Sequence, residues 1–160
     1  NGCQMLSMLK DLIPGTEHWP AFTGNFSERF EARVVMVEIL DSASVLFPGL
    51  SGSRLPIVVA HGEGRVSFKD DSDHDYLSHH RKIVMRYIDN WGSATTDYPF
   101  NPNGSVVGVT GFCSRDGRST IVMPHPERVY RTATCSWHPS EWGDYTPWLE
   151  VFTNARKFCD

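Results

Sequence analysis

The sequence lacks the long apolar run that a membrane span requires, since its apolar runs fall far short of about 20 residues. It has no excess of basic residues either: 15 Lys and Arg stand against 19 Asp and Glu, which gives a net charge of −4. This balance gives no reason to expect a nucleic acid or an anionic membrane as partner. The absence of internal repeats excludes a repeat architecture.

The sequence also lacks a paired-cysteine pattern. Its four cysteines, Cys3, Cys113, Cys135 and Cys159, are scattered, and none belongs to a CxxC pair. A chain of 160 residues that is 40% hydrophobic can bury a sizeable core without disulfides. We therefore expect reduced thiols in a cytosolic protein, organised as about one domain.

A metal-binding loop is not supported by the acidic stretch 70–75. Counted from Asp71 as the first ligand, the position that needs Gly is Tyr76 and the position that needs Glu is Lys82, so an EF-hand is rejected. The histidines that follow, His74, His79 and His80, lack the i, i+4 spacing of a zinc helix. We expect no metal site, and we expect the acids to cap a short helix that ends near residue 81.

Hydrophobic periodicity predicts an α/β domain. Strands are expected over 32–40, 44–47, 55–60, 83–89, 106–113 and 119–123, with helices over 3–13 and from Pro147 onward. The sequence Asp116-Gly117 marks a hairpin between the last two strands. On the last helix the side chains expected in the core are Trp148, Phe152, Ala155 and Phe158, with Asn154 outward. The first helix shows one apolar face: Met5, Leu6, Met8, Leu9, Leu12 and Ile13.

The stretch 119–128 carries the clearest chemical pattern. A strand that ends at Met123 runs into Pro124 and Pro126, which stiffen the backbone and favour an extended conformation. In an extended segment residues i and i+2 point the same way, so His125 and Glu127 should project together. An imidazole backed by a carboxylate is the base and its orienting group in a nucleophilic triad. The alternative is a strand-ending turn with two surface polar side chains.

Two other features are chemically suggestive. Cys3 lies in the first turn of the first helix, where the helix dipole lowers the pKa of a thiol; the alternative is a small buried apolar residue. Gly62 and Gly64 follow the strand over 55–60 and allow either close approach by a ligand or a tight bend, of which the bend is favoured.

Several stretches together resemble the class I (triad) glutamine amidotransferases, whose domain is a flavodoxin-like three-layer α/β fold. The start 1–5 (NGCQM) and 124–127 (PHPE) carry this resemblance. Longer stretches are similar to the C-terminal glutaminase domain of the phosphoribosylformylglycinamidine synthase family, in its large single-chain form: 61–65 (HGEGR), 86–90 (RYIDN), 101–105 (NPNGS), 116–118 (DGR), 123–128 (MPHPER) and the tail from Glu141 to Trp148.

The resemblance implies a register for the family pattern Gly-x-Cys-x-Gly-x-Gln. If Gly2 is its second Gly and Gln4 its Gln, the nucleophilic Cys stands immediately before Asn1, outside this chain. Cys3 then occupies the variable position and is expected to be a packing neighbour of the active site. We therefore expect residues 1–160 to be the C-terminal portion of the domain, with its first elements and a synthetase region upstream.

The resemblance also implies roles for individual residues. His125 and Glu127 complete a Cys-His-Glu triad, and the backbone N–H of Asn1 is an oxyanion-hole donor. Residues implied in substrate binding are Gln4, Asn90 and Gly92.

The implied reaction is hydrolysis of glutamine through a thioester. The ammonia passes to the synthetase region of the same polypeptide, which uses ATP and Mg²⁺ to convert formylglycinamide ribonucleotide to formylglycinamidine ribonucleotide in purine biosynthesis. No cofactor is expected in residues 1–160, and residues 61–65 could lie at the interface with that region. The alternatives are another triad amidotransferase and a catalytically inactive glutaminase-like module that docks on and regulates a synthetase.

Overall fold

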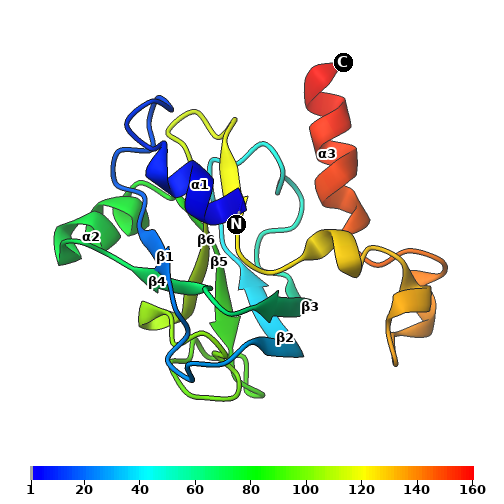
Figure 1. The fold of residues 1–160 in the computed structure, drawn as a ribbon. Helices are drawn as coiled ribbons and strands as arrows, with labels where there is room; N and C mark the ends of the chain where they lie inside the picture. The colour runs from blue at the N-terminus through cyan, green and yellow to red at the C-terminus, as the bar shows by residue number, and fades with distance from the viewer. Residues whose placement is uncertain (1) are drawn as a thin grey trace.

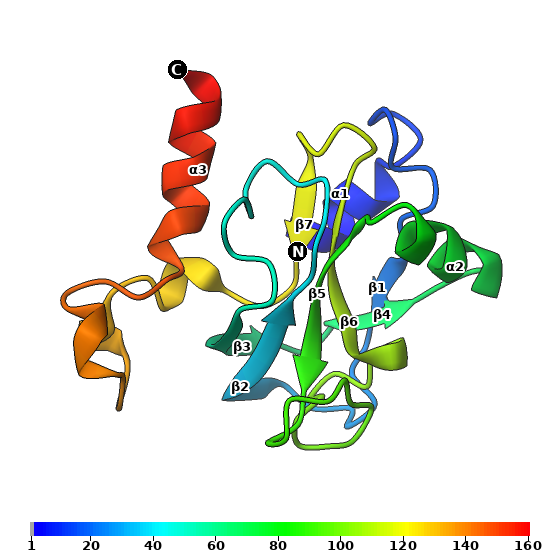
Figure 2. The ribbon, with the colours of Figure 1, turned by 180° about the vertical axis from the view of Figure 1, so that it is seen from behind.

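The computed structural model describes residues 2–160, which form a mixed α/β fold and confirm the expected fold class. In both views α3 lies at one side of the sheet and α2 at the other (Figures 1 and 2). The helices and strands are α1 (Gly2–Met8), β1 (Ala21–Thr23), β2 (Glu31–Ile39), β3 (Arg54–His61), β4 (Arg65–Ser67), α2 (Asp71–His79), β5 (Ile83–Ile88), β6 (Val109–Cys113), β7 (Thr120–Val122) and α3 (Leu149–Cys159).

The main sheet has five strands in the order β3-β2-β5-β6-β7, and every neighbouring pair is antiparallel. The sheet curls so that its two edges meet. His125, which follows β7, forms an isolated antiparallel bridge with Val58 of β3, and its backbone N–H donates to the Val58 carbonyl at 2.8 Å. We call this contact the seam. A separate two-stranded sheet pairs β1 with β4.

The strands form where the apolar residues alternate. On β2 the buried side chains are every second residue, Val35, Val37 and Ile39, which is the period of a strand with one face on the core. The paired strand β3 buries Leu55, Ile57 and Val59 in the same cluster. The expected strands over 32–40, 55–60 and 83–89 are therefore confirmed, with bounds shifted by at most one residue.

The expected strand over 44–47 is wrong, because this segment forms turns. Ser44 explains the difference: its hydroxyl pairs with Thr120 Oγ1 at 2.7 Å and accepts from the backbone N–H of Leu46 at 3.3 Å. Such local side-chain bonds to the backbone favour a turn over a ladder of strand bonds. Phe47 is nevertheless buried in the main core cluster.

The first helix is shorter than predicted. α1 ends at Met8, and turns occupy residues 9–14. The hydroxyl of Thr16 donates to the carbonyls of Lys10 and Ile13 at 2.8 Å each. These bonds hold residues 10–16 in a compact turn, so the helix does not continue to Pro14. The expected apolar face is only partly buried: Leu6 packs against a core cluster, whereas Met5, Met8, Leu9 and Leu12 are exposed.

The helix at the C-terminus buries a different face from the one predicted. Trp148 and Val151 are buried as part of the main core, but Phe152 and Phe158 are exposed. Asn154, expected outward, is buried, because its side-chain amide donates to the backbone carbonyls of the turn beside it, Leu46 at 3.1 Å and Pro48 at 2.9 Å.

The short helix α2 agrees with the prediction. Asp70 caps it by accepting a hydrogen bond from the backbone N–H of Ser72 at 2.9 Å. Within residues 2–160 no helix combines the length and the apolar character needed to cross a bilayer.

Candidate active site

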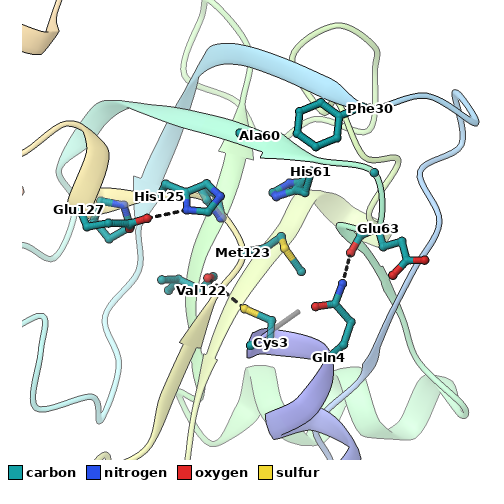
Figure 3. A pocket seen from close by; sticks show the side chains of 14 residues that line it. Cys3, Gln4, Phe30, Ala60, His61, Glu63, Val122, Met123, His125 and Glu127 are labelled. Carbon is teal, nitrogen blue, oxygen red and sulfur yellow. Dashed lines mark hydrogen bonds and ion pairs between the residues drawn. The ribbon is translucent and has the colours of Figure 1, made fainter.

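A cavity of about 610 Å³ lies where the seam, the end of β3 and the start of α1 come together. Figure 3 shows its lining, with His125 and His61 on one side and the side chains of α1 on the other. The lining residues are Gly2, Cys3, Gln4, Phe30, Ala60, His61, Gly62, Glu63 and residues 122–127. Four parts of the chain that are far apart in the sequence therefore share one cavity.

The predicted His–Glu pair is formed in this cavity. His125 Nδ1 lies 2.6 Å from Glu127 Oε1, and the two side chains are 25% and 54% exposed. Because an ionised carboxylate only accepts hydrogen bonds, Nδ1 carries the hydrogen and Nε2 is the basic nitrogen. Since the His125 backbone is bonded to Val58, the seam fixes the position of this base.

The local backbone differs from the extended segment that was expected. Pro126 begins a short 3₁₀ turn, Pro126–Arg128, so Glu127 does not continue a strand. A proline is compatible with the first position of such a turn because it has no N–H to satisfy. The two side chains meet across this turn, so the pairing was predicted correctly although the geometry that produces it was not.

Gln4 also lines the cavity. Its side-chain nitrogen donates to the backbone carbonyl of Glu63 at 2.7 Å, which ties α1 to the loop after β3. Its side-chain oxygen Oε1 is buried and has no hydrogen-bond partner among the described residues. An unpaired buried acceptor is costly, so this oxygen is suited to an N–H group of a ligand.

Cys3 is held as a protonated thiol. Its Sγ donates to the carbonyl of Val122 at 3.2 Å, and the side chain packs against a second core cluster, which includes Trp19, Phe112 and Ile121. Burial raises the pKa of this thiol, the opposite of the shift that an activated nucleophile requires. This geometry supports the interpretation of Cys3 as a packing neighbour of the site.

If the chain hydrolyses glutamine, as the family resemblance implies, replacement of Cys3 by serine is expected to keep that activity within about threefold of wild type, because a hydroxyl can donate to the same carbonyl. The measurement is kcat for glutamate release by the full-length protein, with Cys159→Ser, an exposed thiol on α3, as control. A loss as complete as that caused by removing His125 would show that Cys3 is itself the nucleophile.

His61, at the end of β3, faces His125 across a centroid separation of 5.9 Å, with 37° between the ring planes. Its Nε2 lies 3.2 Å from Asn103 Oδ1, while its Nδ1 is buried without a partner among residues 2–160. Burial, with a smaller contribution from His125, lowers the pKa of His61 to about 4. His61 is therefore neutral at neutral pH.

This depressed pKa makes stability depend on pH. The folded protein binds fewer protons at His61 than the unfolded chain between pH 6.5 and about 4, so the contribution is present above pH 6.5 and is lost as the pH falls through this window. We expect the denaturant midpoint to fall between pH 7 and pH 5, and to fall less in His61→Gln. Equal drops in the two proteins would contradict this expectation.

Two predicted substrate-binding residues lie elsewhere. Asn90 and Gly92 follow β5 and line a separate hollow with Arg54 and Trp91, and neither lines the cavity. Gly92 has φ +84°, a left-handed backbone conformation that favours glycine. The His–Glu pair lines the cavity, and these two residues do not. Their role in substrate binding stays a prediction.

The remaining predictions have mixed outcomes. Asn1 lies outside the described residues, so its role as an oxyanion-hole donor stays a prediction. All four cysteines are free thiols, as expected. Within residues 2–160 no group of three or more His, Cys, Asp or Glu side chains is arranged to hold a metal ion.

Sequence reasoning missed two contributors to the site. Phe30 lines the mouth of the cavity and is 67% exposed. Asn103 is fully buried and contacts His61 from behind. The run 101–105 indicated a turn, but nothing in it indicated that a side chain of this turn would be buried against the cavity wall.

Comparison with known proteins places the chain in a class. The model of the CobB/CobQ-like glutamine amidotransferase domain matches residues 1–159, and the chain belongs to this family. The predicted class, a glutamine amidotransferase domain, is thereby confirmed.

A solved structure shares the fold. The "Structure of PurLQS from Thermotoga maritima" superposes with a TM-score of 0.63 at 22% sequence identity, covering 88% of this chain and 53% of that chain. At this identity the likeness shows the fold. The present chain spans about half the length of that matched chain.

Proposed function

We propose that this chain is the glutaminase part of a phosphoribosylformylglycinamidine synthase. The observation that carries the proposal is the His125–Glu127 pair, held at 2.6 Å on the wall of a cavity that the start of α1 completes. Family membership supports glutamine as substrate. The stretches 61–65, 101–105 and 123–128, together with the structural likeness to PurLQS from Thermotoga maritima, support the particular synthase.

The proposed nucleophile is a thiol supplied by the residue preceding Asn1. His125 Nε2 takes the thiol proton, and Glu127 orients the ring and stabilises its charged form. The thiolate attacks the side-chain carboxamide carbon of glutamine. As the tetrahedral intermediate collapses, the amide nitrogen of the substrate takes the proton from His125 and leaves as ammonia, and a glutamyl thioester remains.

The second half of the reaction returns the enzyme to its starting state. His125 removes a proton from water, the resulting hydroxide attacks the glutamyl thioester, and glutamate leaves as the thiol regains its proton. The proposed oxyanion-hole donor on this chain is the backbone N–H of Asn1. Gln4, with its unpaired Oε1, is the proposed substrate contact from α1.

The proposed fate of the ammonia is transfer to a synthetase region of the same polypeptide, with cytoplasmic purine biosynthesis as the setting. That region would bind ATP, Mg²⁺ and formylglycinamide ribonucleotide. We assign no residue of this chain to ATP or to a metal ion.

The test compares two nitrogen sources in the full-length protein. With glutamine we expect equal release of glutamate and formation of formylglycinamidine ribonucleotide, and with an ammonium salt we expect synthesis without glutamate. Glutamate release without ribonucleotide amidination would assign the chain to another amidotransferase. Synthesis from ammonium alone, with no glutamate from glutamine under any condition, would instead identify an inactive docking module.

A further inference from the structure

The loop that follows β3 is held by two buried asparagines from different parts of the chain. Asn25 donates through its side chain to the His61 carbonyl at 2.8 Å and accepts from the Gly64 backbone N–H at 3.0 Å. Its own backbone N–H donates to the Gly62 carbonyl at 2.9 Å. Asn103, fully buried, donates to Asn25 Oδ1 at 2.8 Å. The loop 61–64 is thus hydrogen-bonded at both ends to Asn25, and Asn103 in turn holds the side chain of Asn25.

These bonds fix the orientation of both amides. A backbone N–H can only donate and a carbonyl can only accept, so the contacts of Asn25 with Gly64 and His61 decide which of its atoms is oxygen. Asn103 Nδ2 must then face Asn25, which leaves Asn103 Oδ1 as the acceptor on its other side. Tyr87, fully buried, donates its hydroxyl to this oxygen at 2.7 Å.

The orientation of Asn103 in turn fixes the tautomer of His61. Because Asn103 Oδ1 is an acceptor, the His61 Nε2 atom that lies 3.2 Å from it carries the hydrogen. Nδ1 of His61 is then an unprotonated acceptor. Gly64 closes the arrangement, since a Cβ there would lie 2.5 Å from His61 Nε2 and 2.6 Å from Asn103 Nδ2.

A neutral His61 matters because of what faces it. Its ring is 5.9 Å from that of His125, which becomes positively charged when it takes a proton in the proposed reaction. A second imidazolium at that distance would oppose this proton transfer. The other ionisable groups around His61 are Arg128 after the seam, Tyr87 through Asn103, and Glu63, Glu127 and Cys3 on the cavity wall.

We propose that Asn103 is a positioning residue of the glutaminase cavity, which holds His61 as the neutral Nε2–H tautomer and fixes the loop 61–64 against α1. This proposal rests on the glutaminase function proposed above. It assigns a role to the turn 101–105, and it requires an amide at position 103, because a carboxylate there would favour a charged His61.

The test is Asn103→Asp, which keeps the shape of the side chain. Its carboxylate stabilises the imidazolium of His61, so we expect kcat/KM for glutamine in the full-length protein to fall about 10- to 100-fold near pH 6.5. The loss should shrink toward pH 8.5, as His61 gives up the added proton. The pH profile therefore acquires a new acid limb.

Asn101→Asp is the matched control. Asn101 is also buried in this turn, but its side chain bonds only to backbone groups, Thr95, Gly104 and Ser105, and not to His61. It should leave the shape of the pH profile unchanged. If the two aspartate variants have the same profile shape, Asn103 is merely structural and the proposal is wrong. In a protein that already carries His61→Gln, Asn103→Asp should no longer shift the acid limb of the kcat/KM pH profile. A shift that persists there would also overturn the proposal.

Denaturation provides a readout that needs no glutaminase activity. A raised His61 pKa contributes stability that is present below the unfolded value and is lost as the pH rises, so Asn103→Asp should be more stable at pH 5 relative to pH 7 than wild type is. If the wild-type protein releases no glutamate, the proposed function is wrong. The comparison of stabilities still tests whether Asn103 controls the protonation of His61.

If Asn103→Asp does not fold, two variants of His61 decide the question. Glutamine at position 61 offers both a donor and an acceptor and should stay within about threefold of wild-type kcat/KM, whereas His61→Leu should raise KM about tenfold. If His61→Gln and His61→Leu change the kinetic constants equally, the proposal is wrong, because a hydrogen bond from position 61 to Asn103 would then make no difference to activity.

Discussion

His125→Ala is expected to abolish glutamine-dependent activity of the full-length protein, with kcat for glutamate release reduced about 1,000-fold or more. The reason is that His125 Nε2 is the basic nitrogen that the His–Glu pair presents to the cavity, so under the proposed mechanism its removal leaves the nucleophilic thiol protonated. Synthesis from added ammonium should continue at close to the wild-type rate. The measurement is the two rates side by side, glutamate release and ribonucleotide amidination.

The control for this variant is His79→Ala, which removes an exposed histidine at the end of α2 that does not line the cavity. It should leave both rates unchanged. If His125→Ala lost the ammonium-dependent rate as completely as the glutamine-dependent one, the division of labour between glutaminase and synthetase would be wrong.

Glu127→Gln is expected to lower kcat for glutamate release about 100-fold, less than loss of the imidazole itself. The carboxylate bonds to His125 Nδ1 at 2.6 Å, so it sets the tautomer of the ring and stabilises the imidazolium. A glutamine amide can present its N–H₂ to the same nitrogen and favour the wrong tautomer. The effect should be moderate because this carboxylate is 54% exposed and water can replace part of its contribution.

The KM of Glu127→Gln shows whether Glu127 orients His125 or binds glutamine. Because Glu127 acts through His125, we expect KM for glutamine to stay within about threefold of wild type while kcat falls. Glu150→Gln, which removes an exposed carboxylate on α3, is the control and should change neither constant. A selective rise in KM with kcat unchanged would contradict the orienting role.

The parts of the fold that the sequence predicted are those set by local patterns. The apolar run 34–37 identified β2, and the acidic stretch 70–75 identified a capped helix at α2. In both cases the residues that define the element also make the contacts that stabilise it. The pairing of His125 with Glu127 followed in the same way from two residues separated by one proline.

The parts that failed depend on partners distant in the sequence. Phe152 and Asn154 were assigned to the wrong faces of α3, because the amide of Asn154 finds the carbonyls of residues 46 and 48, which no helical period reveals. Asn103 looked like an ordinary turn residue, because its contacts are with residues 25, 61 and 87. Burial of a polar side chain is decided by whether such partners exist, and only the folded chain shows them.

The seam between His125 and Val58 has a consequence for when the candidate active site forms during folding. The two residues are far apart in the sequence, so the entropy cost of bringing them together is met only after the strands between them have paired. In a chain whose sheet is still open, His125 is not held against Val58 and is therefore not positioned in the cavity. If the proposed function is right, we expect glutamine hydrolysis to appear during refolding only once this seam has formed.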